Sequence, residues 1–114
     1  MLEAQALADR YVAAWNEPDA GRRLEAIDAL WAPGAASHGF GALGKLMLGS
    51  SRGNGRRAGV RFRAALNARR QRDVVAFRWE MLLVDSETVL ATGLEFLVVD
   101  DEGRILVDHP FAPA

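Results

Sequence analysis

The chain has 114 residues, of which 50% are hydrophobic and 25% charged, with a net charge of −1 and no cysteine. We expect residues 1–114 to form one domain, since this length suits a single hydrophobic core. The absence of cysteine excludes disulfides and thiolate metal sites. No apolar run is long enough to span a bilayer, and the first ten residues lack the pattern of a signal peptide. We therefore expect a cytoplasmic protein without membrane contact.

Basic side chains are concentrated in the middle of the chain. Residues 45–72 hold nine basic and no acidic side chains, whereas residues 73–114 hold nine acidic and two basic ones. A basic block suits an anion or nucleic-acid surface, or it suits the solvent faces of strands whose arginines pair with carboxylates. Because the whole chain is close to neutral, we favour the second interpretation and expect no nucleic-acid partner.

Two amphipathic helices are predicted in the first third of the chain. Within residues 3–16, Leu7, Tyr11 and Trp15 recur at i, i+4 and i+8, which places them on one apolar face. Asp19 is a plausible N-cap for a second helix that ends before Pro33-Gly34. Its expected apolar face comprises Leu24, Ile27, Leu30 and Trp31.

Alternating apolar and polar residues predict antiparallel strands in the second half. The expected strands are residues 60–64, 73–83, 88–99 and 104–109, with turns at 85–86 and 100–103. Helices followed by such a meander indicate an α+β fold. Residues 35–37 suit a short strand, and the glycine-rich segment 38–59 suits an irregular loop.

Four segments carry a resemblance to the nuclear transport factor 2-like superfamily, with its SnoaL-like and ketosteroid isomerase-like domains: residues 10–16, 30–35, 75–80 and 93–105. The resemblance implies a curved, mixed but mainly antiparallel sheet that forms a half-cone around the N-terminal helices, a cystatin-like roll with a central pocket. It also implies a homodimer through the outer sheet face. Segment 38–59 departs from the resemblance, because the family usually has a third helix there.

Three positions in the sequence correspond to polar groups of the ketosteroid isomerase site, and two of them carry a polar side chain here. Tyr11 resembles the phenol that donates a hydrogen bond to an oxyanion, but we favour the alternative that it is a core tyrosine whose hydroxyl is satisfied at an edge. Glu95 resembles a protonated carboxylic acid in the same site, and burial there is expected to raise its pKa. Alternatively, Glu95 lies at a rim or dimer contact and pairs with an arginine. The position of the general base is Gly39, which cannot abstract a proton.

Two histidines are candidates to replace that base. His38 is next to Gly39, but a bulge would be needed to turn it inward. Of the neighbours Asp108 and His109, only one faces inward on a regular strand. We expect the inward residue to be His109, because on a regular strand His109 shares a face with Ile105 and Val107. A histidine tied to a backbone carbonyl is the alternative role.

The aromatic side chains suit either a packed core or the wall of an apolar pocket. We expect the pocket to be lined by Trp15, Phe77, Trp79 and Phe111. Two functions from different classes remain. The first is binding of a small apolar ligand without catalysis. The second is a cofactor-free isomerase, cyclase or dehydratase that moves a proton on a small carbonyl compound. No metal-ligand spacing is present, so no metal and no cofactor are expected.

Overall fold

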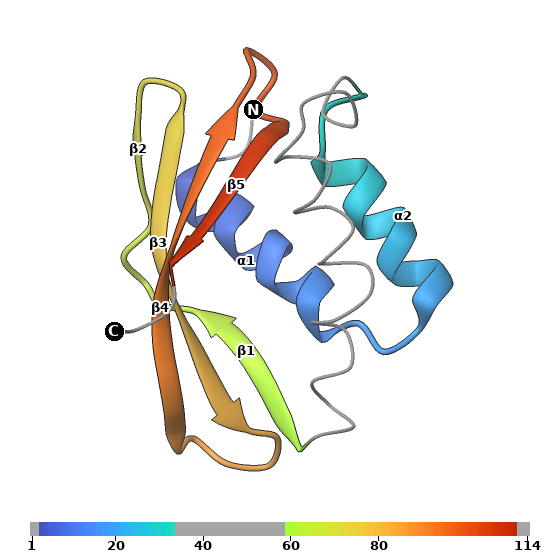
Figure 1. Cartoon of the computed structure of the whole chain (residues 1–114), viewed down its shortest axis with the longest axis vertical. Coiled ribbons are helices and arrows are strands. Elements are labelled where there is room, and N and C mark those ends of the chain that lie inside the picture. The colour runs from blue at the N-terminus through green and yellow to red at the C-terminus, as the bar shows by residue number, and fades with distance from the viewer. Residues whose placement is uncertain (1–2, 34–58, 112–114) are drawn as a thin grey trace.

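The computed structural model describes residues 3–33 and 59–111 (Figure 1). The short strand expected at 35–37, the candidate base His38 and nearly all of the glycine-rich segment lie outside the described residues. Two helices come first, α1 (Ala4–Asn16) and α2 (Ala20–Leu30). The strands are β1 (Val60–Ala64), β2 (Arg69–Gln71), β3 (Val74–Leu83), β4 (Val89–Val99) and β5 (Ile105–Phe111).

The five strands of the described residues belong to one antiparallel sheet. The order is β1-β3-β4-β5, and β2 pairs with β3. Figure 1 shows the sheet curling so that α1 lies across its concave side, with α2 on the far side of α1. The α+β class with a curved sheet is thus confirmed, and the three layers are sheet, α1 and α2.

The predicted apolar face of α1 is confirmed, since Leu7, Tyr11 and Trp15 are buried against the sheet. The side-chain amide of Asn16 fixes the end of the helix to the edge strand β1. Its Nδ2 donates to the carbonyl of Phe62 at 2.6 Å, and its Oδ1 accepts from the Phe62 N–H at 2.8 Å. A two-point contact of this kind sets both the position and the angle of α1, and therefore of Tyr11.

The apolar face of α2 differs from the prediction. Asp19 caps the helix as expected, accepting from the Arg22 N–H at 2.8 Å. Leu24, however, is 53% exposed, whereas Arg23 is only 6% exposed. The guanidinium of Arg23 donates to the Glu17 carbonyl at 2.8 Å. Long basic side chains bury their aliphatic stems in this way, so the buried stripe starts one residue earlier than hydrophobicity suggests.

A β-bulge in β5 reverses the predicted facing of its last residues. Val99 pairs with Ile105 but Val98 pairs with Val107, which leaves Leu106 as an extra residue. An extra residue shifts the period-two alternation by one, so every later side chain changes face. The alternation that placed His109 beside Ile105 therefore fails at the bulge.

His109 and Phe111 are consequently corrected to the outer face, and Asp108 is the inward residue. Asp108 lies opposite Leu97 and is 2% exposed, while His109 is exposed. Phe111 lies opposite Leu94 on the convex side and is 55% exposed. Its ring packs edge-on against Phe96, with centroids 5.4 Å apart. Phe111 therefore does not line the concave side.

Charged side chains pair across the strands near β1, as expected for part of the basic block. Arg63 Nε lies 2.9 Å from Glu80 Oε1, directly across from it on β3. Arg61 lies 3.0 Å from Glu87, to which Arg63 also donates. The hydrogen bond from Arg63 and its positive charge lower the pKa of the Glu87 carboxyl.

Within the described residues, no helix combines the length and the hydrophobicity that a membrane crossing requires.

Candidate functional site

Tyr11 and Asp108 form a buried hydrogen bond between α1 and β5. The Tyr11 hydroxyl donates to the Asp108 carboxylate, and both residues are buried. Tyr11 is 0% exposed because it occupies the centre of the α1 apolar face. Asp108 reaches it because the bulge turns this carboxylate inward. A hydrogen bond donated to a carboxylate favours its charged form.

Glu95 is a second carboxyl on the concave face, in a different environment. It lies between Phe77 on β3 and Pro110 on β5, and it is 0% exposed. Both of its oxygens are buried, and neither has a hydrogen-bond partner among residues 3–33 and 59–111. Burial without a donor disfavours the carboxylate anion, so the neutral, protonated form is favoured. A neutral carboxyl both donates and accepts, which suits contact with a polar ligand atom.

The two carboxyls are neighbours on the same face. Asp108 lies opposite Leu97, which is two residues from Glu95 along β4. Such a diagonal pair is separated by roughly 7–8 Å between backbones, with side chains able to come closer. The negative charge that Asp108 would carry further favours the neutral form of Glu95. Two carboxyls with opposite preferences are the usual arrangement of an acid and a base.

Aromatic rings surround these polar groups. Tyr11 and Trp15 meet edge-to-face at 5.3 Å, and Trp15 meets Phe62 at 5.5 Å. Phe62 in turn meets Trp79 at 6.1 Å, and Phe77 on the same strand as Trp79 is 2% exposed. Trp15, Phe77 and Trp79, three of the four residues expected to line a pocket, therefore lie on the concave side. This apolar surrounding strengthens electrostatic interactions within it.

Gly93 lets the Trp79 ring cross from β3 onto β4. The two residues are direct partners in the sheet. A Cβ at Gly93 would lie 2.2 Å from Trp79 Cζ2, 2.4 Å from Trp79 Cε2 and 2.6 Å from the Phe111 carbonyl oxygen. The indole therefore lies directly over the backbone of Gly93, where no other residue leaves room for it.

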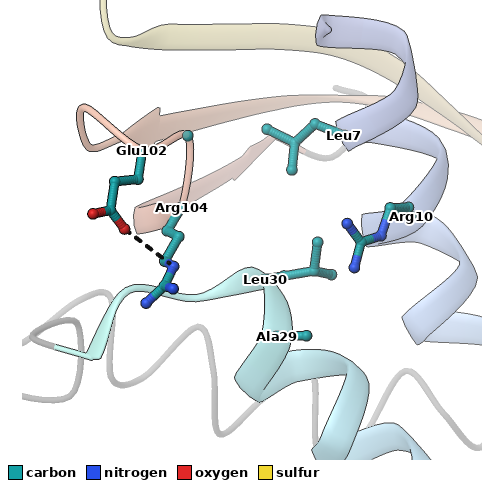
Figure 2. Close-up of a pocket in the computed structure, with 7 residues that line it drawn as sticks. Leu7, Arg10, Ala29, Leu30, Glu102 and Arg104 are labelled. Carbon is teal, nitrogen blue, oxygen red and sulfur yellow. Dashed lines mark ion pairs between the residues drawn. The ribbon is translucent and has the colours of Figure 1, made fainter. Parts of the chain in front are cut away.

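Grooves lined by described residues lie away from this interior. Figure 2 shows one of about 360 Å³, where Leu7 and Leu30 lie between the arginines Arg10 and Arg104. Glu102 lies 3.6 Å from Arg104 at its edge. A second groove, of about 520 Å³, lies on the outer sheet face; it is lined by Arg69, Gln71, Arg72, Asp73, Val74, Ala76 and Phe96. Neither contains a residue of the Tyr11–Asp108 pair.

Comparison with known proteins identifies the fold. Neither a protein-family model nor a curated protein matches the sequence. Among solved structures, the chain is similar to a protein of the SnoaL-like family from Agrobacterium tumefaciens strain C58, for which an isomerase activity has been suggested. The TM-score is 0.74 at 23% identity, over 96% of each chain.

The chain has the SnoaL-like fold. The SnoaL-like fold accounts for the order of helices and strands and for the curved sheet around α1. At 23% identity the similarity extends to the fold alone. The similarity therefore assigns no activity to the residues of the concave face, among them Tyr11, Asp108 and Glu95.

Sequence reasoning missed three residues of this site. Asp108 was assigned to the outer face, although the unbroken apolar run from Ile105 to Val107 has no alternation and could have signalled a bulge. Phe62 lies on a strand predicted correctly, but its contact with Trp15 depends on how α1 is seated. Gly93, in a strand interior, was a signal for a close approach to the backbone.

Proposed function

We propose that the protein binds a small, largely apolar carbonyl compound against the concave face of the sheet. The observation that carries the proposal is Glu95, a fully buried carboxyl whose two oxygens have no hydrogen-bond partner in the described part of the chain. Leaving such a group unsatisfied costs about 1–3 kcal/mol, so its retention fits a partner that arrives with a ligand. A protonated Glu95 would donate to the carbonyl oxygen, and the surrounding aromatic rings would hold the apolar frame.

The test compares a ketone with a hydrocarbon of the same shape. Binding of 4-tert-butylcyclohexanone and of its analogue with CH₂ in place of the oxygen is followed through the intrinsic tryptophan fluorescence of the protein. We expect wild-type protein to prefer the ketone, and Glu95→Leu to weaken ketone binding about tenfold, as the loss of one buried hydrogen bond implies. Glu87→Leu, at an exposed carboxylate, is the control and should bind normally. Absence of ketone binding, or equal binding by Glu95→Leu, would contradict the proposal.

A second candidate function is proton transfer on the bound carbonyl compound. The Tyr11–Asp108 hydrogen bond favours it, because it supports a charged Asp108 beside a neutral Glu95. Asp108 would then take a proton from a carbon next to the carbonyl group, while Glu95 stabilises the developing oxyanion. Exchange of these hydrogens for deuterium in heavy water, lost in Asp108→Asn, would distinguish this function from binding alone.

We also propose that two copies associate through the outer sheet face. Leu94 and Phe111 are direct partners across β4 and β5, and they are 45% and 55% exposed. Phe96 packs beside them, so the three form a contiguous apolar patch. Burial of such a patch in a dimer would remove it from water.

Light scattering tests this association. We expect wild-type protein to have the mass of a dimer and Leu94→Glu to have that of a monomer, because a charge would then be desolvated in the interface. Leu66→Glu is the matched control, since Leu66 is 91% exposed in the connection between β1 and β2. A monomeric wild-type protein, or a dimeric Leu94→Glu, would refute the proposal.

A further inference from the structure

Trp79 carries a buried hydrogen-bond donor for which the described residues supply no acceptor. Its Nε1 is shielded from solvent, and none of the described residues accepts a hydrogen bond from it. A buried N–H without an acceptor is unfavourable and rare in native proteins. The indole lies over Gly93 through the ring carbons Cζ2 and Cε2, so this packing makes no use of the N–H. The N–H therefore calls for an explanation of its own.

The sheet register places Trp79 diagonally across from Glu95 on the neighbouring strand. Trp79 Cε2 lies directly over Gly93, and Nε1 is bonded to Cε2. Gly93 and Glu95 are two residues apart on β4, so their Cα atoms are separated by roughly 7 Å and share one face. Trp79 and Glu95 thus occupy neighbouring positions on the concave face, and each has buried polar atoms without a hydrogen-bond partner among the described residues, while Tyr11 donates to Asp108 on the same face.

We infer that Trp79 is a ligand-binding residue of the same site and that the ligand carries two oxygen functions. The inference rests on the proposed function, in which Glu95 contacts the carbonyl oxygen. Because an indole N–H only donates, the second ligand atom must be an acceptor, such as a hydroxyl, ether or further carbonyl oxygen. The ligand class is accordingly a hydroxy- or oxo-substituted ketone on a small apolar frame. Gly93 determines this specificity indirectly, by allowing the indole to reach β4.

A preference ratio tests the inference. The probes are 4-tert-butylcyclohexanone and its 2-hydroxy and 3-hydroxy analogues. We expect wild-type protein to bind one hydroxyketone about tenfold more tightly than the ketone. Trp79→Phe should lower the ratio of hydroxyketone to ketone affinity to about one, whatever its effect on the affinity for the ketone itself. The control Trp31→Phe removes another buried indole N–H that has no acceptor among the described residues. Trp31 pairs with Ile105, which lies opposite Val99 at the far end of β4, so this variant should retain the preference.

The outcomes separate the two claims. If wild-type protein binds the ketone with dependence on Glu95 but shows no preference for a hydroxyketone, or if Trp79→Phe keeps the preference, Trp79 does not contact the ligand. If the ketone itself does not bind, the proposed function fails first.

The indole N–H resonance of Trp79 in the wild-type protein provides a second measurement that requires no variant to fold. We expect it to shift downfield with the preferred hydroxyketone and not with the ketone. An unmoved resonance, or one already hydrogen-bonded to a trapped water that also contacts Glu95, would overturn the inference.

Discussion

Replacement of Gly93 by alanine is expected to lower the free energy of unfolding by about 3 kcal/mol, the upper end of what overpacking usually costs. The new Cβ would lie 2.2 Å from Trp79 Cζ2 and 2.6 Å from the Phe111 carbonyl oxygen, both far inside contact distance. The Trp79 ring can move only by disturbing Trp15 and Phe62, and the carbonyl belongs to the backbone of β5. Alanine also lowers the entropy of the unfolded chain, but that gain of about 0.4–1 kcal/mol is smaller.

Urea denaturation of wild type and Gly93→Ala provides the measurement, with Gly21→Ala as the matched control. Gly21 is exposed in the first turn of α2, and its nearest contact would be a side-chain oxygen of Asp19 at 3.3 Å. Alanine there should be neutral or slightly stabilising, because it favours the helix. Trp79→Phe should partly rescue Gly93→Ala. Equal stability of wild type and Gly93→Ala would show that the indole does not lie over this backbone.

Replacement of Glu95 by leucine is expected to raise the free energy of unfolding at pH 7 by about 1–3 kcal/mol in the absence of ligand. Leucine is of similar size and removes a buried carboxyl whose oxygens have no hydrogen-bond partner within the described residues. Asp108, its neighbour on the same face, accepts from Tyr11 and would lose no hydrogen bond. The gain in stability would accompany the loss of ketone binding, a trade-off typical of functional sites.

The increase in the free energy of unfolding caused by Glu95→Leu should depend on pH in a defined direction. If burial raises the pKa of the folded Glu95 carboxyl, the folded state holds a proton that the unfolded state releases above about pH 4.3. Wild-type stability then falls as the pH rises through this range, so the advantage of Glu95→Leu grows from pH 4 to pH 7. Denaturation curves at both pH values measure it. An advantage that shrinks with rising pH would mean that Glu95 is ionised in the folded protein.

The helices and the long strands could be predicted from the sequence because burial imposes their periods. Leu7, Tyr11 and Trp15 repeat with the helical period, and Val75 and Phe77 alternate with the period of a strand. The short strand β2 was missed, because all three residues Arg69–Gln71 are exposed and polar and carry no such period. Pairing with β3 alone makes them a strand.

The candidate site was harder to predict, because one inserted residue decides which side chains enter it. The bulge at Leu106 exchanges Asp108 for His109 on the concave face and moves Phe111 to the outside. Neither the polarity of Asp108 nor that of His109 reveals which of them is buried. Glu95, by contrast, lies on a regular stretch of β4. Its side chain could be predicted to point inward because it shares a strand face with Leu97 and Val99.

The protonation state of Glu95 in the folded protein at pH 7 tests the central claim most directly. Carbon-13 NMR of protein labelled at the glutamate side-chain carboxyl carbons measures it, and Glu95→Gln identifies the resonance. We predict the chemical shift of a protonated carboxyl, unchanged until well above the range in which exposed glutamates such as Glu87 titrate. A Glu95 resonance that is already ionised at pH 7 and titrates with the exposed glutamates would contradict the account.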